Sequence, residues 1–149
     1  MVNLPRKPHA DGYIKKIEYI FFNRDKIIEE VIEVKLRRIY PEVKTQSGTG
    51  DPTATEAFKN LTPLESVVVD NQILYQPEQW LEVAEKTFNW CISSGSAYSQ
   101  IFIDRYTDKK YFVQTITQLE ISTDQYYKIL NKIRNRAALI AAWHHLINV

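Results

Sequence analysis

The sequence contains little that could crosslink a small fold or anchor it in a membrane. Its 149 residues include one cysteine, Cys91, which excludes an internal disulfide and a zinc site built on cysteines. No stretch approaches the roughly 18 uncharged apolar residues that a membrane-spanning helix requires, and residues 1–11 have no apolar run like that of a secretory signal. We therefore expect an intracellular protein without membrane contact, with Cys91 buried as a small apolar side chain.

Patterns typical of metal binding or catalysis are missing as well. His144 and His145 are neighbours, so on a helix their side chains point about 100° apart, whereas a metal-binding pair is spaced four residues apart. The third histidine, His9, is distant in the sequence, and no Ser-His-Asp, nucleophile-elbow or paired-carboxylate pattern stands out from the composition. We expect no metal, no cofactor and no enzyme activity.

The net charge is nearly zero, but the two signs are segregated along the chain. Residues 1–40 carry a formal charge of +3, residues 41–99 carry −5 and residues 100–149 carry +3. Attraction to phosphate depends on the local potential of the contacting surface rather than on the net charge. The basic last segment is therefore compatible with a nucleic-acid partner, whereas the acidic middle segment is not.

Residues 13–39 have the apolar spacing of one long amphipathic helix. Apolar residues recur every three or four positions, and charged residues occupy the other face. Part of the segment also fits a heptad repeat, although arginine occupies two positions of its apolar seam. We expect this helix to pack on the rest of the protein or on a second copy of the chain, which makes a homo-oligomer through residues 13–39 one hypothesis. Lys35, Arg37 and Arg38 near its end would complement the helix dipole or contact nucleic acid.

Residues 41–63 are poor in large apolar side chains and contain two of the four glycines, which is typical of a linker or loop. Thr53 with Glu56, and Thr62 with Glu65, fit the Ser/Thr-x-x-Glu capping box. Short helical turns are therefore expected to begin at both threonines. No Gly-Lys-Ser/Thr follows the glycines, so a phosphate-binding loop is excluded.

Two β-branched, apolar stretches on either side of Asp70 and Asn71 predict a small β-hairpin or an extended segment. Pro77 then marks a helix start, and apolar residues at helical spacing continue to a stop before Ser93. The fold class is thus expected to be mainly helical. It would comprise a helical arm over residues 1–40, a linker over residues 41–63 and a helical domain over residues 64–149.

The last third of the chain predicts three helices in close succession. They cover residues 96–106, residues 111–119 and a segment capped by Ser122, which forms a capping box with Gln125. The sequence Leu-Glu-Ile-Ser, from position 119 to 122, resembles the Leu-Gly-Ile-Ser turn of helix-turn-helix proteins. We therefore expect a DNA-binding helix-turn-helix over residues 96–136, with a plain three-helix bundle as the alternative.

In that motif the second helix lies across the DNA backbone and the third enters the major groove. Transferred to this sequence, the motif turns five side chains inward: Ile116, Leu119, Ile121, Tyr126 and Ile129. The predicted DNA-binding residues supply hydrogen-bonding groups for base edges and cations for phosphate. They are Lys109, Lys110, Ser122, Thr123, Gln125, Tyr127, Lys128, Asn131 and Lys132. Glu120 stands where the motif usually has glycine, Ile116 stands where it has a small residue, and Asp124 would repel phosphate.

Four segments of the chain together resemble the phage transcriptional activators of the RinA and ArpU type, which end in a helix-turn-helix similar to region 4 of sigma factors. The segments are GDPTATEA from Gly50, ILYQPEQWLEVAEKTFNW from Ile73, FIDRYTDKKYF from Phe102 and LEISTDQYYKILNKIRNRAALIAA from Leu119. The resemblance implies a phage or prophage protein, in the cytoplasm of a bacterial host, that binds promoter DNA and activates late or packaging genes. Family members usually have glutamate where Asp104 stands, and tryptophan and arginine where Tyr127 and Lys128 stand. The resemblance therefore does not imply which DNA sequence this chain binds.

Two other functions remain open at this point. A small terminase subunit, which recognises packaging DNA, also combines a helix-turn-helix with oligomerising helices. A helical adaptor would instead bind a protein through the acidic middle segment and never contact DNA. Glu78, Glu82 and Glu85 lie three or four residues apart on one predicted helical face, which would point away from DNA. That face is either simply solvated or available to a protein partner such as RNA polymerase.

Overall fold

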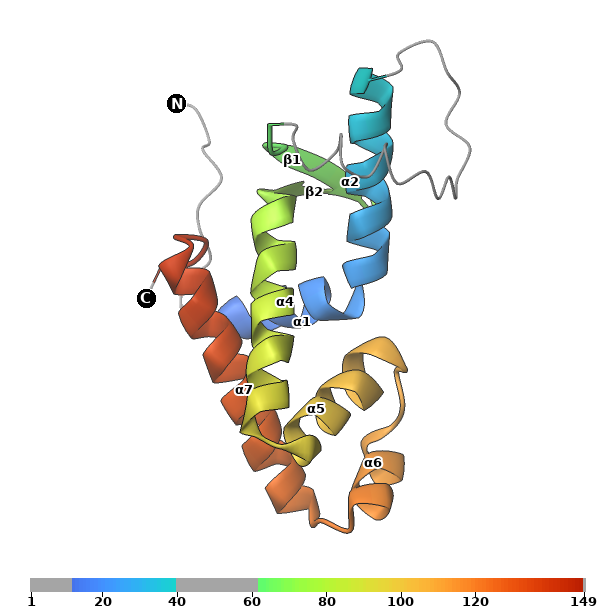
Figure 1. Cartoon of the computed structure of the whole chain (residues 1–149), viewed down its shortest axis with the longest axis vertical. Helices are drawn as coiled ribbons and strands as arrows, with labels where there is room; N and C mark the ends of the chain where they lie inside the picture. Colours follow the sequence, from blue (N-terminus) through green and yellow to red (C-terminus); the bar gives the residue numbers. More distant parts are fainter. Residues whose placement is uncertain (1–11, 40–61, 149) are drawn as a thin grey trace. The chain divides into compact units, whose positions relative to one another are not determined.

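The computed structural model describes residues 12–39 and 62–148, and this part of the chain is mainly helical with one small β-hairpin (Figure 1). In chain order the elements are α1 (Tyr13–Phe22), α2 (Arg24–Ile39), β1 (Ser66–Val69), β2 (Gln72–Tyr75), α4 (Pro77–Ser94), α5 (Ser96–Phe102), a π-helical turn (Ile103–Thr107), α6 (Phe112–Leu119) and α7 (Thr123–Trp143). The expected fold class is confirmed. The last three predicted helices are all present, although the first of them ends in the π-helical turn.

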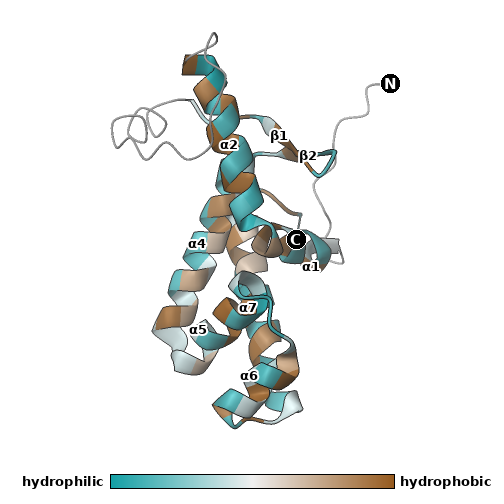
Figure 2. Ribbon diagram, turned by 90° about the vertical axis from the view of Figure 1, so that its right-hand side faces the viewer, coloured by the Kyte–Doolittle hydropathy of each residue, from teal (hydrophilic) through white to brown (hydrophobic). Residues whose placement is uncertain are grey.

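The prediction of one continuous helix over residues 13–39 is wrong, because the segment forms two helices, α1 and α2, separated at Asn23. The backbone carbonyl of Asn23 accepts a hydrogen bond from the backbone N–H of Ile27 at 3.0 Å, so Asn23 occupies the N-cap position of α2. Asparagine is among the residues preferred there. Apolar periodicity did not reveal the break, because each helix keeps its own buried stripe. Figure 2 shows the alternation of hydrophobic and hydrophilic residues along α2.

Contacts divide the chain into two compact units, one made of Met1–Phe22 with Glu82–Val149 and the other of Asn23–Leu81. The expected segments, residues 1–40, 41–63 and 64–149, do not coincide with this division. The reason is that α1 contacts α7 in the first unit, while α2 contacts β1 in the second. The predicted linker over residues 41–63, like the helical turn expected at Thr53, lies almost entirely outside the described residues.

The hairpin of the second unit forms where it was predicted. β1 and β2 pair antiparallel, with Val67 opposite Leu74, and the two connecting residues, Asp70 and Asn71, have φ of 51° and 61°. Two consecutive left-handed residues define a type I′ turn, whose twist matches that of the strands. Val67, Val69 and Leu74 are buried, so one face of the hairpin belongs to the core of this unit.

The helical turn predicted at Thr62 is absent, and residues 62–65 have no helix or strand before β1 begins at Ser66. In a capping box the Glu65 side chain would reach back toward Thr62. Instead the Glu65 backbone carbonyl accepts a hydrogen bond from Gln76 N at 2.8 Å, just beyond the paired strands. Strand pairing of the β-branched run therefore outweighs the short capping signal.

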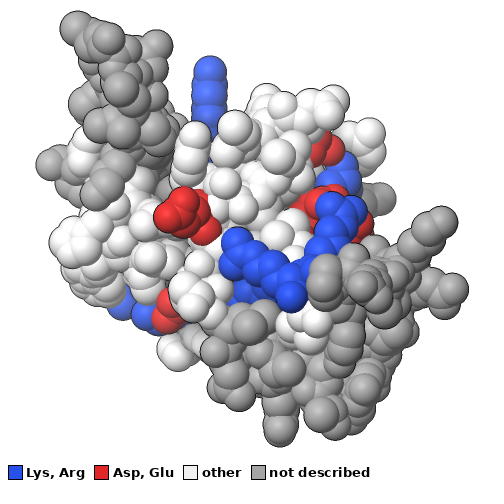
Figure 3. All heavy atoms as spheres, turned by 90° about the horizontal axis from the view of Figure 1, so that it is seen from above, with Lys and Arg blue, Asp and Glu red and all other residues white. Residues whose placement is uncertain are grey.

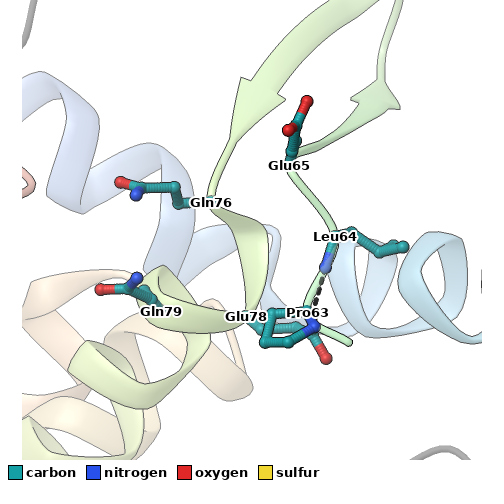
Figure 4. A pocket seen from close by; sticks show the side chains of 6 residues that line it. All are labelled: Pro63, Leu64, Glu65, Gln76, Glu78 and Gln79. Carbon is teal, nitrogen blue, oxygen red and sulfur yellow. Dashed lines mark hydrogen bonds between the residues drawn. The ribbon is translucent and has the colours of Figure 1, made fainter. Parts of the chain in front are cut away.

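The carboxylate of Glu78 is a structural group of the second unit, which corrects the expectation that it lies with Glu82 and Glu85 on one acidic face open to solvent or to a protein partner. Its Oε1 atom forms an ion pair with Lys35, whose side chain is 5% exposed, and its Oε2 atom accepts a hydrogen bond from Leu64 N at 2.7 Å. Figure 4 shows that bond within a small pocket lined by Pro63, Leu64, Glu65, Gln76, Glu78 and Gln79. Lys35 thus neutralises an internal carboxylate rather than a helix terminus.

The core of the first unit is formed by side chains from α1, α4, α5 and α7. Its fully buried apolar positions are Ile17, Ile20, Val83, Cys91, Ile101, Leu130, Ile133, Ala137 and Ala141. The burial expected for Cys91 is confirmed, and it raises the pKa of the thiol to about 12. Phe21 extends this core, with its ring 5.3 Å from Phe102 and 5.1 Å from Tyr106. Within the described ranges no helix is both long and apolar enough to cross a membrane.

Candidate nucleic-acid interface

The turn between α6 and α7 consists of Glu120, Ile121 and Ser122 (Figure 1). Glu120 takes the left-handed conformation, with φ 56° and ψ 44°, at the position where helix-turn-helix proteins usually have glycine. The backbone N–H of Glu120 and, at 3.2 Å, that of Ile121 both donate to the carbonyl of Ile116, which closes the end of α6. The chain therefore makes the sharp turn with a glutamate, at a conformational cost on the order of 1 kcal/mol relative to glycine.

The start of α7 is fixed by the capping box that the sequence predicts. Gln125 N donates to Ser122 Oγ at 3.1 Å, and Ser122 N donates to Gln125 Oε1 at 2.9 Å. Both residues are exposed and both belong to the predicted DNA-binding set. Since their oxygens hold the cap, what they still offer a ligand is the Ser122 hydroxyl hydrogen and the Gln125 amide NH2 group.

The side chains predicted to face inward are covered to different degrees. Tyr126 is 1% exposed, and its burial raises the pKa of its phenol. Ile116, Leu119, Ile121 and Ile129 are half-buried. The ring of Phe112, at the start of α6, lies 6.1 Å from the ring of Tyr126 and so joins the two helices. An apolar seam between α6 and α7 is thus present, with Tyr126 as its buried member and the other four residues half-buried.

All nine predicted DNA-binding residues are exposed, but they differ in what their side chains contact. Lys109, Lys128 and Lys132 have no carboxylate partner in the part of the chain that the structure describes. Lys110 does have one, because its Nζ atom lies 3.6 Å from Asp104 Oδ1. Charge alone therefore does not make the lysines of this surface equivalent.

The remaining polar residues of this surface also fall into two groups. Thr123 projects from the first turn of α7 with no side-chain partner among the described residues, while the ring of Tyr127 packs 6.0 Å from that of Phe112. Asn131 Oδ1 accepts a hydrogen bond from Arg134 at 3.3 Å, which leaves the amide NH2 of Asn131 as the outward donor. Glu120 and Asp124 are exposed beside them and reduce the positive potential.

Two arginines that the charge count assigns to the basic segment are used internally. Arg134 Nε donates to Glu18 Oε1 at 2.6 Å, and Arg105 Nη2 lies 3.2 Å from the same oxygen. Glu18 comes from α1, Arg105 from the π-helical turn and Arg134 from α7, so one carboxylate oxygen connects three elements of the first unit. Sequence reasoning missed this cluster, because the three residues are far apart in the chain.

A second buried polar cluster was also missed. Asp104, in the π-helical turn, is 0% exposed and accepts hydrogen bonds from Gln100 Nε2 at 2.6 Å and from Thr115 Oγ1 at 3.0 Å. A signal was available in the sequence, because Asp104 follows the apolar Ile101 by three positions and so falls on its buried helical face.

Figure 3 views the molecule from above the orientation of Figure 1, and on that face Lys and Arg side chains lie beside Asp and Glu side chains. The described residues contain no group of three or more His, Cys, Asp or Glu side chains arranged to hold a metal ion. The candidate surface is defined by exposed donors at the connection between α6 and α7, with the carboxylates of Glu120 and Asp124 beside them, rather than by a large field of one sign. The chain matches no protein-family model, no curated protein and no solved structure.

Proposed function

We propose that the chain binds double-stranded DNA in a sequence-specific manner, with the first turns of α7 in the major groove and α6 across the backbone. The observation that carries this proposal is the connection between the two helices. A left-handed residue ends α6, a complete capping box starts α7, and the next turns of α7 present unpaired polar groups to solvent. That combination is what a helix-turn-helix needs to aim a rigid helix at a groove.

The exposed groups suit the two kinds of contact that DNA recognition requires. The Asn131 amide donor and the Thr123 hydroxyl are able to hydrogen bond with base edges in the major groove. Lys128 and Lys132, four residues apart on α7, are cations for the flanking phosphates. With few free cations and two nearby carboxylates, we expect binding with a modest salt dependence, in which base contacts provide a large share of the affinity.

The biological role that fits this proposal is transcriptional regulation. In the ordering of its segments the chain resembles the phage activators of the RinA and ArpU type. On that basis we propose a regulator of phage or prophage late or packaging genes that acts in the bacterial cytoplasm, contacts RNA polymerase and has no enzyme activity. Glu82 and Glu85, exposed on α4, remain as candidates for the polymerase contact, whereas the internal ion pair of Glu78 removes it from that surface.

The test begins with selection of bound duplexes from a random library by the full chain. The double variant Lys128→Ala with Asn131→Ala is then compared with the wild-type chain on the selected duplex by fluorescence anisotropy. Loss of a base contact and a phosphate contact should weaken binding by at least about tenfold. The control is Lys15→Ala with Asn89→Ala, which removes the same two residue types from exposed positions on α1 and α4.

The two double variants should melt within a degree or two of each other, since all four side chains are exposed. If both variants bind the selected duplex as tightly as the wild-type chain, α7 is not the recognition helix. If the library yields no bound duplex, the chain is not a sequence-specific DNA-binding protein.

A further inference from the structure

The segment between α5 and α6 contains two adjacent lysines, Lys109 and Lys110, that look equivalent in the sequence but not in the structure. Lys110 N donates a hydrogen bond to the Asp104 carbonyl at 2.7 Å, and its Nζ atom lies 3.6 Å from Asp104 Oδ1. Lys109 makes neither kind of contact within the described ranges and has a left-handed backbone, with φ 54°. The chain thus reverses at Lys109 and returns Lys110 to Asp104.

Asp104 joins the three parts of this region. It accepts hydrogen bonds from Gln100 on α5 and from Thr115 on α6, and it forms the ion pair with Lys110 on the connecting segment. Thr115 is 1% exposed and is the fully buried residue of α6. A carboxylate removed from water requires hydrogen bonds and a counter-charge, or it destabilises the structure that buries it. In the described part of the chain, Lys110 is the cation that supplies this counter-charge.

Asp104 lies in the π-helical turn, Ile103–Thr107, and is one of its two buried residues, with Tyr106. The i to i+5 pattern there is fixed by the hydrogen bond from Asp108 N to the Ile103 carbonyl at 2.9 Å. An inserted residue of this kind changes the direction of the following side chains and is often found at functional sites. Here Asp104 of this turn accepts a hydrogen bond from Thr115 of α6, the helix proposed to lie across the DNA backbone.

We infer that Asp104 and Lys110 form an internal latch that orients α6, so that Lys109 contacts DNA phosphate while Lys110 acts as a positioning residue. This inference rests on the proposed DNA binding for the role of Lys109, but the latch itself does not. A cation already paired with a buried carboxylate releases no additional counterion when DNA binds, whereas an unpaired lysine does. The two lysines are therefore distinguishable by the salt dependence of binding.

The experiment compares Lys109→Gln with Lys110→Gln in the full chain, using two measurements. The first is the dependence of affinity for the selected duplex on salt concentration. The second, made without DNA, is amide hydrogen exchange of α6. For Lys109→Gln we expect the slope of log K against log salt to decrease by about one, with exchange of α6 unchanged. For Lys110→Gln we expect an unchanged slope and exchange of the α6 amides that is faster by about tenfold or more.

Thr115→Val is a second test of the latch, because it removes the hydroxyl donor to Asp104 and conserves the shape of the side chain. It should accelerate exchange in α6 as Lys110→Gln does, while Thr115→Ser, which retains a hydroxyl, should restore slow exchange. Equal losses of salt slope in both lysine variants, with exchange of α6 unchanged, would overturn the inference. If the wild-type chain binds no duplex, the proposed function fails, but the exchange measurements still decide whether Asp104 and Lys110 hold α6.

Discussion

Glu18 offers the sharpest test of how the first unit is held together, and the variant to make is Glu18→Gln. Glu18 Oε1 is 2.6 Å from Arg134 Nε and 3.2 Å from Arg105 Nη2, and the Glu18 side chain is 15% exposed. The glutamine keeps the shape and one acceptor oxygen but removes the negative charge. Two guanidinium groups would then remain beside a neutral side chain, without the charge that balances them.

The magnitude lies between two limits. Removing one partner of a fully buried ion pair costs about 3–5 kcal/mol, and removing one from an exposed pair costs about 0–1 kcal/mol. The Arg105 and Arg134 side chains are 25% and 17% exposed, so water partly screens the pairs. We therefore expect a loss of about 2 kcal/mol in the free energy of unfolding, which for a chain of 149 residues lowers Tm by about 6–8 °C.

The assay is thermal unfolding followed by circular dichroism at low and high salt. The matched control is Glu85→Gln, the same change at an exposed position of α4 where the described residues provide no partner. The control should shift the free energy of unfolding by less than about 0.5 kcal/mol. If Glu18→Gln melts together with Glu85→Gln, the three-residue cluster contributes nothing measurable and the attribution to Glu18 is wrong.

Three further predictions concern other parts of the fold. Because Glu120 has φ 56°, Glu120→Gly should stabilise the chain by up to about 1 kcal/mol in denaturant titrations. Glu85→Gly, within α4, should instead destabilise it by about the same amount. If both variants changed the free energy of unfolding equally, the left-handed turn at Glu120 would be contradicted. Burial raises the pKa of the Cys91 thiol to about 12 in the folded chain, so on raising the pH the thiol ionises in the unfolded chain before it does in the folded chain. The free energy of unfolding should therefore fall as pH rises from about 9 toward 12, and Cys91→Ala should not show this fall. Glu78→Lys should lower Tm by several degrees, because it places a second cation beside the buried Lys35. Glu85→Lys, at an exposed position, should not lower Tm. Equal melting temperatures of the two variants would disprove the internal role of Glu78.

Features that depend on a few neighbouring residues were predictable from the sequence. The capping box of Ser122 and Gln125 and the hairpin turn at Asp70 and Asn71 both formed where their short patterns indicated, because their hydrogen bonds or backbone angles involve residues at most three positions apart. The capping box predicted at Thr62 and Glu65 is equally local, but the helical turn that it predicts does not form. There, a long-range alternative existed in the pairing of β1 with β2.

Charged residues inside an apolar stripe were the main source of error, and the reason is physical. Lys35 follows Ile27 and Val31 at intervals of four residues, so helical geometry places it on their buried face. The spacing predicts burial but cannot name the partner, because Glu78 lies 43 positions away in the sequence. Asp104 presents the same case, since its position relative to Ile101 indicates burial but does not identify Thr115.

The same reasoning explains why a list of exposed basic residues does not define a DNA-binding surface. Lys109 and Lys110 have the same charge and are both exposed, and no local pattern separates them. What separates them is whether a carboxylate from another element lies within 4 Å, and for Lys110 that carboxylate is Asp104 of the π-helical turn. A cation paired with a carboxylate of its own chain is already neutralised by that carboxylate, so it adds little attraction to phosphate. Of the lysines on this surface, we therefore expect the electrostatic part of DNA binding to come from Lys109, Lys128 and Lys132.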